Sequence, residues 1–105
     1  MSIASGQKVI YLVNRDGKIR WHRELQSSAV STSINSRGTI IAVGTEEGRL
    51  IVYDGNGKVK WEKHLSNSDF SVNSVDISSD GQFIVVGTNY SRVYLYNIKG
   101  DILWT

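Results

Sequence analysis

Gly57-Lys58-Val59-Lys60-Trp61 is the stretch that decides the fold, because the chain contains the same five-residue frame three times. The tryptophans of the three frames are 40 and 43 residues apart. A repeat period of this size indicates an array of units, each of which is one supersecondary element. The other two frames are Gly17-Lys18-Ile19-Arg20-Trp21 and Gly100-Asp101-Ile102-Leu103-Trp104, and an Asx residue stands seven positions before each tryptophan, at Asn14, Asp54 and Asn97.

Each unit divides into four segments that have the features of β-strands. Residues 31–34 and 73–77 alternate apolar and polar side chains, which is the period of a strand with one buried face. Residues 39–45 and 82–88 are nearly all apolar, which predicts strands that are buried on both faces. A third apolar run leads into the Asx turn, and the fourth segment alternates polar with apolar residues, as an outer, half-solvated strand does.

Four antiparallel strands in about 40 to 45 residues make up the repeat of a β-propeller blade. The sequence therefore predicts an all-β fold with a partial blade over residues 1–25 and complete blades over residues 26–65 and 66–105. Residues 3–5 align with residues 43–45 as the remnant of a second strand, so the first blade lacks its innermost strand. A β-sandwich is the alternative, but a sandwich has no reason to repeat Gly, Trp and Asx in register.

The composition supports an all-β protein and excludes several other classes. The 105 residues include 11 Val and 11 Ile, and β-branched side chains favour strands over helices. The chain has no cysteine, which excludes disulfides, thiolate metal sites and a cysteine nucleophile but leaves the compartment open. The net charge of +2 is too small to predict a nucleic acid as the default partner. We see neither an apolar run of the roughly 20 residues that a membrane span needs nor a signal-peptide pattern.

The repeated frame Gly-x-Ile/Val-x-Trp resembles the signature of quinoprotein-like (PQQ-like) repeats. The stretch from Ser78 to Thr88, followed by Val93-Tyr94-Leu95-Tyr96, is similar to WD-type repeats, although the Trp-Asp and Gly-His pairs of those repeats are absent. Both resemblances imply a β-propeller over essentially the whole chain. They do not imply one function, because propellers serve as binding modules, scaffolds and enzymes.

The predicted strands are too few for a closed propeller. They make two blades and most of a third, whereas closed propellers typically have about four to eight blades. An open arc exposes two blade faces, and each large apolar side chain that is buried there contributes about 1.5 to 3 kcal/mol. We therefore expect copies of the chain to close a ring through their blade faces, a dimer of about six blades being the simplest. The alternatives are a fragment of a longer propeller and a unit excised or engineered to test propeller assembly.

The polar motifs predict no catalytic, cofactor or metal site. Asp54-Gly55-Asn56-Gly57 resembles the start of an EF-hand calcium loop, but its twelfth position is Leu65, where a bidentate glutamate is needed. An Asx turn that ends in glycine explains the motif. His22 and His64 are not repeat equivalents and lack partners at metal-ligand spacing, so we expect them to be exposed on outer strands.

The frame residues are expected to be structural. On a regularly alternating strand each tryptophan shares a face with the apolar residue two positions before it, which is Ile19, Val59 or Ile102. We expect this face to be buried, which favours packing between blades over a stacking platform for a quinone or a base. The residues of this blade signature are Gly17, Trp21, Gly57, Trp61, Gly100 and Trp104.

Alternating basic residues on the outer strands, such as Lys18 with Arg20 and Lys58 with Lys60, predict a partly basic rim. A solvated face is the simplest reading of this rim, because the third unit has Asp101 and Leu103 in place of the basic residues. Contact with an anionic surface or a nucleic acid is the alternative.

Loops on a rigid scaffold are where binding residues concentrate. We expect a partner on the loops that join second to third strands and successive blades, where two aromatic residues lie in polar surroundings. The predicted contact residues are Glu46, Glu47, Phe70 and Tyr90. The predicted function is a non-enzymatic scaffold that binds copies of itself and a protein or peptide. The alternative is a piece of a PQQ-dependent, quinoprotein-like dehydrogenase whose catalytic residues lie on other blades.

Overall fold

The computed structural model of the chain describes residues 2–6, 8–65, 72–78, 80–88 and 92–104. All regular elements in these ranges are β-strands, which confirms the predicted all-β fold. They form three antiparallel sheets in the orders β1-β2-β3, β4-β5-β6-β7 and β8-β9-β10-β11. The strands are β1 Ser2–Gly6, β2 Val9–Val13, β3 Ile19–Glu24, β4 Ala29–Ile34, β5 Ile40–Thr45, β6 Arg49–Asp54, β7 Val59–His64, β8 Val72–Ile77, β9 Phe83–Thr88, β10 Val93–Asn97 and β11 Ile102–Trp104.

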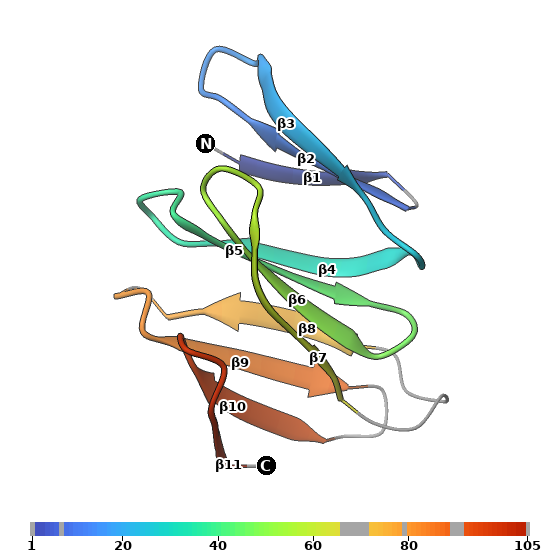
Figure 1. The fold of residues 1–105 in the computed structure, drawn as a ribbon, viewed down its shortest axis with the longest axis vertical. Helices are drawn as coiled ribbons and strands as arrows, with labels where there is room; N and C mark the ends of the chain where they lie inside the picture. Colours follow the sequence, from blue (N-terminus) through green and yellow to red (C-terminus); the bar gives the residue numbers. More distant parts are fainter. Residues whose placement is uncertain (1, 7, 66–71, 79, 89–91, 105) are drawn as a thin grey trace.

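The three sheets follow one another along the longest dimension of the molecule, with β4–β7 in the middle (Figure 1). Consecutive strands are neighbours in every sheet, as in the blades of a propeller. The inner strands of the last two sheets are joined through serine side chains. The backbone N–H groups of Val75 and Ile77 in β8 donate to Oγ of Ser31 and Ser33 in β4, at 3.1 and 3.2 Å.

Strands β5 and β6 are covered on both faces, because alternate side chains pack against the two neighbouring sheets. One set faces sheet β8–β11 and the other faces sheet β1–β3; the first set is Ile40, Ala42, Leu50 and Val52, and the second is Ile41, Val43, Ile51 and Tyr53. Strand β9 differs, since Phe83 and Val85 are 40% and 41% exposed. The prediction that residues 82–88 are buried on both faces is therefore wrong, because none of the described residues covers the second face of β9.

A β-bulge in each outer strand separates the tryptophan from its apolar neighbour. Trp21 pairs with Leu12, whereas Ile19 pairs with Val13, so Arg20 is an extra residue between them. The same register shift occurs in β7 and β11. Because an extra residue reverses the alternation of faces, the predicted sharing of one buried face is wrong. The apolar residues on the other face are exposed: Ile19 58%, Val59 53% and Ile102 49%.

Two of the three tryptophans dock onto the turn of the following sheet. The Nε1–H of Trp21 donates to the Gly55 carbonyl at 3.0 Å, and its ring centroid lies 5.9 Å from that of Tyr53. Trp61 repeats this arrangement one sheet later: its Nε1–H donates to the carbonyl of Ile98 at 2.8 Å, and its ring lies 5.6 Å from that of Tyr96. The contact between neighbouring sheets is thus built from repeat-equivalent residues.

The glycine of the frame makes room for the tryptophan of the preceding sheet. A Cβ at Gly57 would lie 3.0 Å from the Trp21 ring, and one at Gly100 would lie 2.9 Å from the Trp61 ring. At Gly17, in the first sheet, a Cβ would meet open space. Gly57 and Gly17 have the same backbone geometry, since both have a positive φ. The two glycines differ only in what surrounds them.

The first strand is shifted by one residue from its predicted alignment with Val43. Ile3 pairs with Leu12 as Ala42 pairs with Val52, so Ile3 is the equivalent of Ala42. The cause is the connection between β1 and β2, which has two residues where that between β5 and β6 has three. Since a shift of one residue reverses the face, Ile3 packs against the middle sheet.

Side-chain oxygens of Asx residues hold the turns that follow the third strands. Oδ1 of Asp54 accepts hydrogen bonds from the backbone N–H groups of Asn56 and Lys58, at 2.8 and 3.0 Å. These two bonds lower the pKa of the Asp54 carboxyl below its usual 3.8. Asn97 makes the equivalent pair of bonds to Lys99 and Asp101.

We predict that Gly57→Ala lowers the free energy of unfolding more than Gly17→Ala does. Both variants place an L residue in the left-handed region, at φ +85° and +84°, which costs about 1 to 2 kcal/mol. Only the new Cβ at position 57 meets Trp21 and Arg23, which adds about 1 to 3 kcal/mol of overpacking. Urea unfolding of the two variants measures the difference, and equal losses would show that the docking does not depend on the space beside the glycine.

We predict that Asp54→Asn keeps the turn, because Asn97 already makes the same bonds, and removes part of the acid sensitivity. The folded pKa of Asp54 is depressed, so its contribution to stability is present above the unfolded value of 3.8 and is lost as pH falls through the folded value. Unfolding measured between about pH 2 and pH 6 should therefore show wild type losing stability relative to the variant at the acid end. An Asp54 carboxyl that titrates at or above 3.8 by NMR contradicts this account.

Candidate interaction surfaces

Two of the four predicted contact residues, Glu46 and Glu47, are exposed on the loop from β5 to β6. The Glu46 N–H donates to the Ser28 carbonyl at 3.0 Å, which ties this loop to the segment that leads from β3 into β4. The Glu47 carboxylate lies 3.9 Å from Nε of Arg49. The other two predicted contact residues lie outside the described residues: Phe70 and Tyr90.

A cleft of about 290 Å³ lies beside this loop, between sheets β1–β3 and β4–β7. Its lining includes Ile51 and Tyr53 of β6, which are 7% and 4% exposed, and Val59 of β7. Leu25 and Ser27, from the segment between β3 and β4, complete the opposite wall. The sequence prediction placed a partner on these loops but missed the apolar lining, because that lining comes from strands.

The charges at this cleft are mixed. Nη1 of Arg49 lies 3.7 Å from a carboxylate oxygen of Glu62, so the guanidinium lies between two acidic side chains, those of Glu47 and Glu62. Burial raises the pKa of the Tyr53 hydroxyl; the negative charge of Glu62 raises it further, and Arg23 opposes the shift. The Tyr53 phenol therefore stays neutral in the physiological range.

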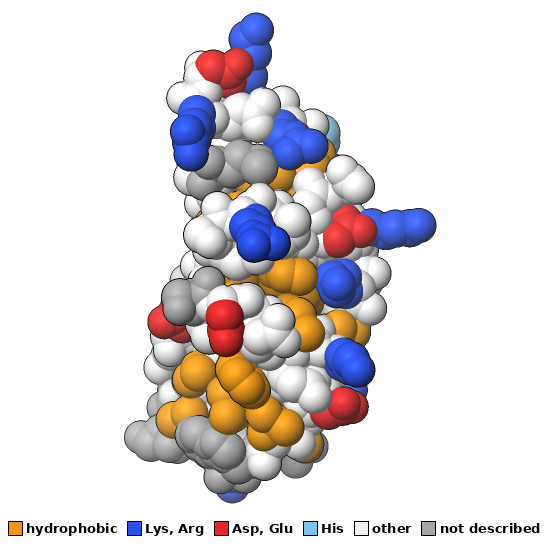
Figure 2. Space-filling model, turned by 90° about the vertical axis from the view of Figure 1, so that its left-hand side faces the viewer, with side chains coloured by type: hydrophobic (Ala, Val, Ile, Leu, Met, Phe, Trp, Pro, Cys, Tyr) orange, Lys and Arg blue, Asp and Glu red, His pale blue; other side chains and the backbone are white. Residues whose placement is uncertain are grey.

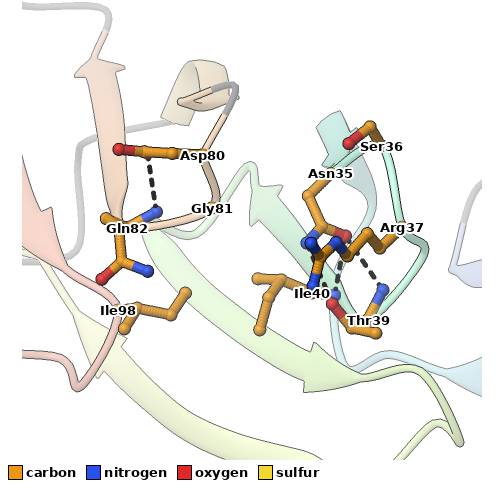
Figure 3. A pocket seen from close by; sticks show the side chains of 9 residues that line it. All are labelled: Asn35, Ser36, Arg37, Thr39, Ile40, Asp80, Gly81, Gln82 and Ile98. Carbon is orange, nitrogen blue, oxygen red and sulfur yellow. Dashed lines mark hydrogen bonds between the residues drawn. The ribbon is translucent and has the colours of Figure 1, made fainter.

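The opposite face, which carries the Asx turns, has a larger and more polar cleft of about 590 Å³ (Figure 3). The turn between β4 and β5, with Asn35 and Arg37, forms one wall, and the turn between β8 and β9, with Asp80 and Gln82, forms the other. Arg37 also lines a neighbouring cleft of about 480 Å³ on the side of the first sheet. Sequence reasoning missed this face, although the paired glycines at 38 and 81 mark both turns.

The polar side chains in these turns are engaged by their own backbone. Oδ1 of Asn35 accepts from the N–H groups of Thr39 and Ile40, at 2.9 and 3.0 Å (Figure 3). Asp80 accepts from the Ser78 hydroxyl and from the Gln82 N–H, and these bonds lower the pKa of its carboxyl. Their role in the structure is to shape the turns.

A third surface is the outer face of sheet β8–β11, where hydrophobic side chains gather at the C-terminal end of the molecule (Figure 2). Phe83, Val85 and Val93 are 40%, 41% and 40% exposed. Their repeat equivalents in the middle sheet are Ile40, Ala42 and Leu50, which are buried against the next sheet. We call the surface formed by Phe83, Val85 and Val93 the end face.

The residues that the sequence offers as possible metal ligands, His22, His64 and Asp54, have other contacts in the structure. No group of three or more His, Cys, Asp and Glu side chains in the described part of the chain could hold a metal ion. His22 is exposed on β3 with its ring 6.2 Å from that of Tyr11, and His64 is exposed on β7 with Nε2 3.1 Å from the Glu47 carbonyl oxygen. Asp54 is held by its turn, as described above.

The predicted basic residues of the outer strands are exposed; they are Lys18, Arg20, Lys58 and Lys60. Arg23 behaves differently, because its guanidinium lies 5.1 Å from the centre of the Trp21 ring and its Nε–H donates to the Gly57 carbonyl at 2.8 Å. One basic side chain of the outer strand therefore reinforces the contact between sheets. A helix long and apolar enough to cross a membrane is not found among the described residues.

Comparison with solved structures shows the fold. BamB from Moraxella catarrhalis superposes with a TM-score of 0.80 at 24% identity, over 97% of this chain and 31% of that chain. Sqt1 from Saccharomyces cerevisiae gives 0.79 at 18% identity, over 93% and 28%. A protein of unknown function from Bacteroides caccae gives 0.76 at 21% identity, over 94% and 36%. This chain thus spans about a third of the length of the structures that it resembles.

The superpositions show the fold, and the comparison with family models identifies the family. A search of the curated proteins gives no match. The model described as outer membrane protein assembly factor BamB matches residues 2–105, which include all three tryptophan frames. The chain therefore belongs to this BamB family of PQQ-like β-propeller repeats.

Proposed function

We propose that this chain is a non-enzymatic assembly scaffold whose copies associate through their blade faces to close a propeller ring. The end face carries this proposal. Phe83 and Val85 are exposed at positions whose equivalents, Ile40 and Ala42, are covered by the next sheet. Within the chain, the equivalent residues of the middle sheet pack against sheet β8–β11. We therefore expect the end face to pack against a sheet of the same kind, from another copy.

The opposite end of the molecule supports the same proposal. Gly17 has the positive φ of Gly57, but a Cβ added there would meet open space, whereas one at Gly57 would meet Trp21. On the same side of the first sheet, Ile19 is 58% exposed. A tryptophan frame from a second copy would fill this space, so the two ends of the molecule are complementary and the association is head to tail.

The number of copies in the ring can be inferred from the usual number of blades and from the length of a solved propeller. Two copies give the smallest ring, of about six blades, within the usual range of about four to eight. The BamB structure is matched over 31% of its length by 97% of this chain, which supports a ring of three copies.

Two observations support a scaffold over an enzyme. The family description is that of an assembly factor. In addition, the carboxylates of Asp54 and Asp80 are bonded within their own turns, where they shape the surface. We further propose that the loop face with Glu46, Glu47, Phe70 and Tyr90 receives a protein or peptide, because its described residues are exposed and lie beside a cleft.

We predict a molar mass of two or three times 11.7 kDa by size-exclusion chromatography with light scattering at micromolar concentration. Val85→Lys should convert the assembly to a folded monomer, because it places a charge at the centre of the end face. Val30→Lys is the matched control, since Val30 is 44% exposed on β4 and outside the end face. A folded wild-type monomer, or an assembly that Val85→Lys leaves intact, overturns the proposal.

A further inference from the structure

The first junction lies between sheets β1–β3 and β4–β7, and the second between sheets β4–β7 and β8–β11. The two junctions differ at one position in the third strand of the later sheet, which is β6 in the first and β10 in the second. In the second junction Tyr94 of β10 reaches across to the preceding segment, where its hydroxyl lies 3.4 Å from the Leu65 carbonyl oxygen. The register identifies Ile51 as its equivalent, since Ile51 pairs with Val43 and Tyr94 pairs with Val86, 43 residues later in both strands. The first junction therefore lacks a phenol ring that the second junction contains.

The space that corresponds to this ring is the cleft between sheets β1–β3 and β4–β7. Its volume is about 290 Å³, just below the usual range of about 300 to 1,000 Å³ for ligand pockets, so it suits a single side chain. Ile51, Tyr53 and Val59 offer apolar contacts. Leu25, the equivalent of Leu65, forms part of the opposite wall.

Two buried polar atoms in the lining of the cleft have no hydrogen-bond partner. Ser27 is 5% exposed, and its Oγ is unpartnered. Nε of Arg49 also has no hydrogen-bond partner, since its ion pair with Glu47, at 3.9 Å, is too long for a hydrogen bond. Buried polar groups are nearly always bonded in native proteins, so this pair indicates a missing partner. The Arg49 Nε–H needs an acceptor and the Ser27 hydroxyl can donate or accept, so a hydroxyl group, which does both, matches the chemistry of either atom.

The charges around the cleft select among such groups. Arg49 already faces two carboxylates, those of Glu47 and Glu62, so a further carboxylate would be repelled. A neutral hydroxyl meets no such repulsion. Combined with the apolar lining, this favours an aromatic ring that bears a hydroxyl.

We propose that this cleft binds the tyrosine side chain of a partner polypeptide, whose ring takes the place that Tyr94 holds in the second junction. The site lies within one chain, between its first and second sheets, so it does not depend on ring closure. This proposal rests on the proposed binding of a protein or peptide at the loop face, and it names the residue of the partner that binds there. A failure to bind tyrosine would leave the proposed ring untouched, because the ring is tested by the molar-mass measurement.

The test is an NMR titration with N-acetyl-L-tyrosinamide, with N-acetyl-L-phenylalaninamide and p-cresol as comparison probes. We expect chemical-shift changes at Leu25, Ser27 and Ile51, and an affinity for the tyrosine amide about two- to tenfold above that for the phenylalanine amide, the worth of one net hydrogen bond. Binding of p-cresol without binding of the tyrosine amide would identify a site for free phenols and overturn the assignment to a polypeptide.

Two variants, each with a matched control, test separately the contribution of the tyrosine ring and that of its hydroxyl to binding. Ile51→Tyr should fill the cleft as Tyr94 fills its equivalent and abolish binding. Val30→Tyr, which adds the same side chain at an exposed position of β4 outside the cleft lining and the end face, should leave binding unchanged. Ser27→Ala should remove the preference for tyrosine over phenylalanine, and Ser28→Ala, at the neighbouring position, should keep it. Unfolding curves of all four variants establish that they are folded.

Three further results would overturn the proposal. These are the absence of shift changes at Ile51 and Leu25 at millimolar probe, equal affinities for the tyrosine and phenylalanine amides, and wild-type binding by Ile51→Tyr.

Discussion

Each sheet of this protein is held to the next by an indole that docks onto a turn. Trp21 and Trp61 each need three things from the following sheet: a glycine with no Cβ, a carbonyl that accepts from Nε1, and a tyrosine ring. The repeat supplies all three at constant positions, so the two junctions have nearly the same geometry. A contact of constant geometry at each junction gives the sheets a regular spacing, and the chain superposes on about a third of the longer BamB propeller.

A contact that always points to the next sheet leaves the two ends of the arc different from its middle. Strands β5 and β6 are buried on both faces, whereas β9 has Phe83 and Val85 at its uncovered surface. The same kind of side chain that forms hydrophobic core in the middle sheet is therefore exposed at the end of this chain, and the proposed function places the contact between copies there. In the proposed assembly, copies would associate through the same kind of sheet-to-sheet contact that joins the sheets within the chain.

The repeat suffices to predict the strands and the fold, because period, glycine and tryptophan recur in register and average out local ambiguity. It does not predict single-residue changes. The bulge at Arg20 moves Ile19 to the face opposite Trp21, and the short connection after β1 moves Ile3 by one position. Neither alters composition or period. The cleft is a third case: it depends on Ile51 standing where the next unit has Tyr94, a difference whose meaning appears only when the two junctions are superposed.

Hydrogen exchange of backbone amides at low and high protein concentration tests the central claim, that a blade needs both faces covered. Amides of β6, which is covered within the chain, should exchange slowly at both concentrations. Those of β10, whose outer face carries the exposed Val93, should exchange faster in dilute solution and slow down as the concentration rises. Equal protection of β6 and β10 in the dilute monomer would contradict the account.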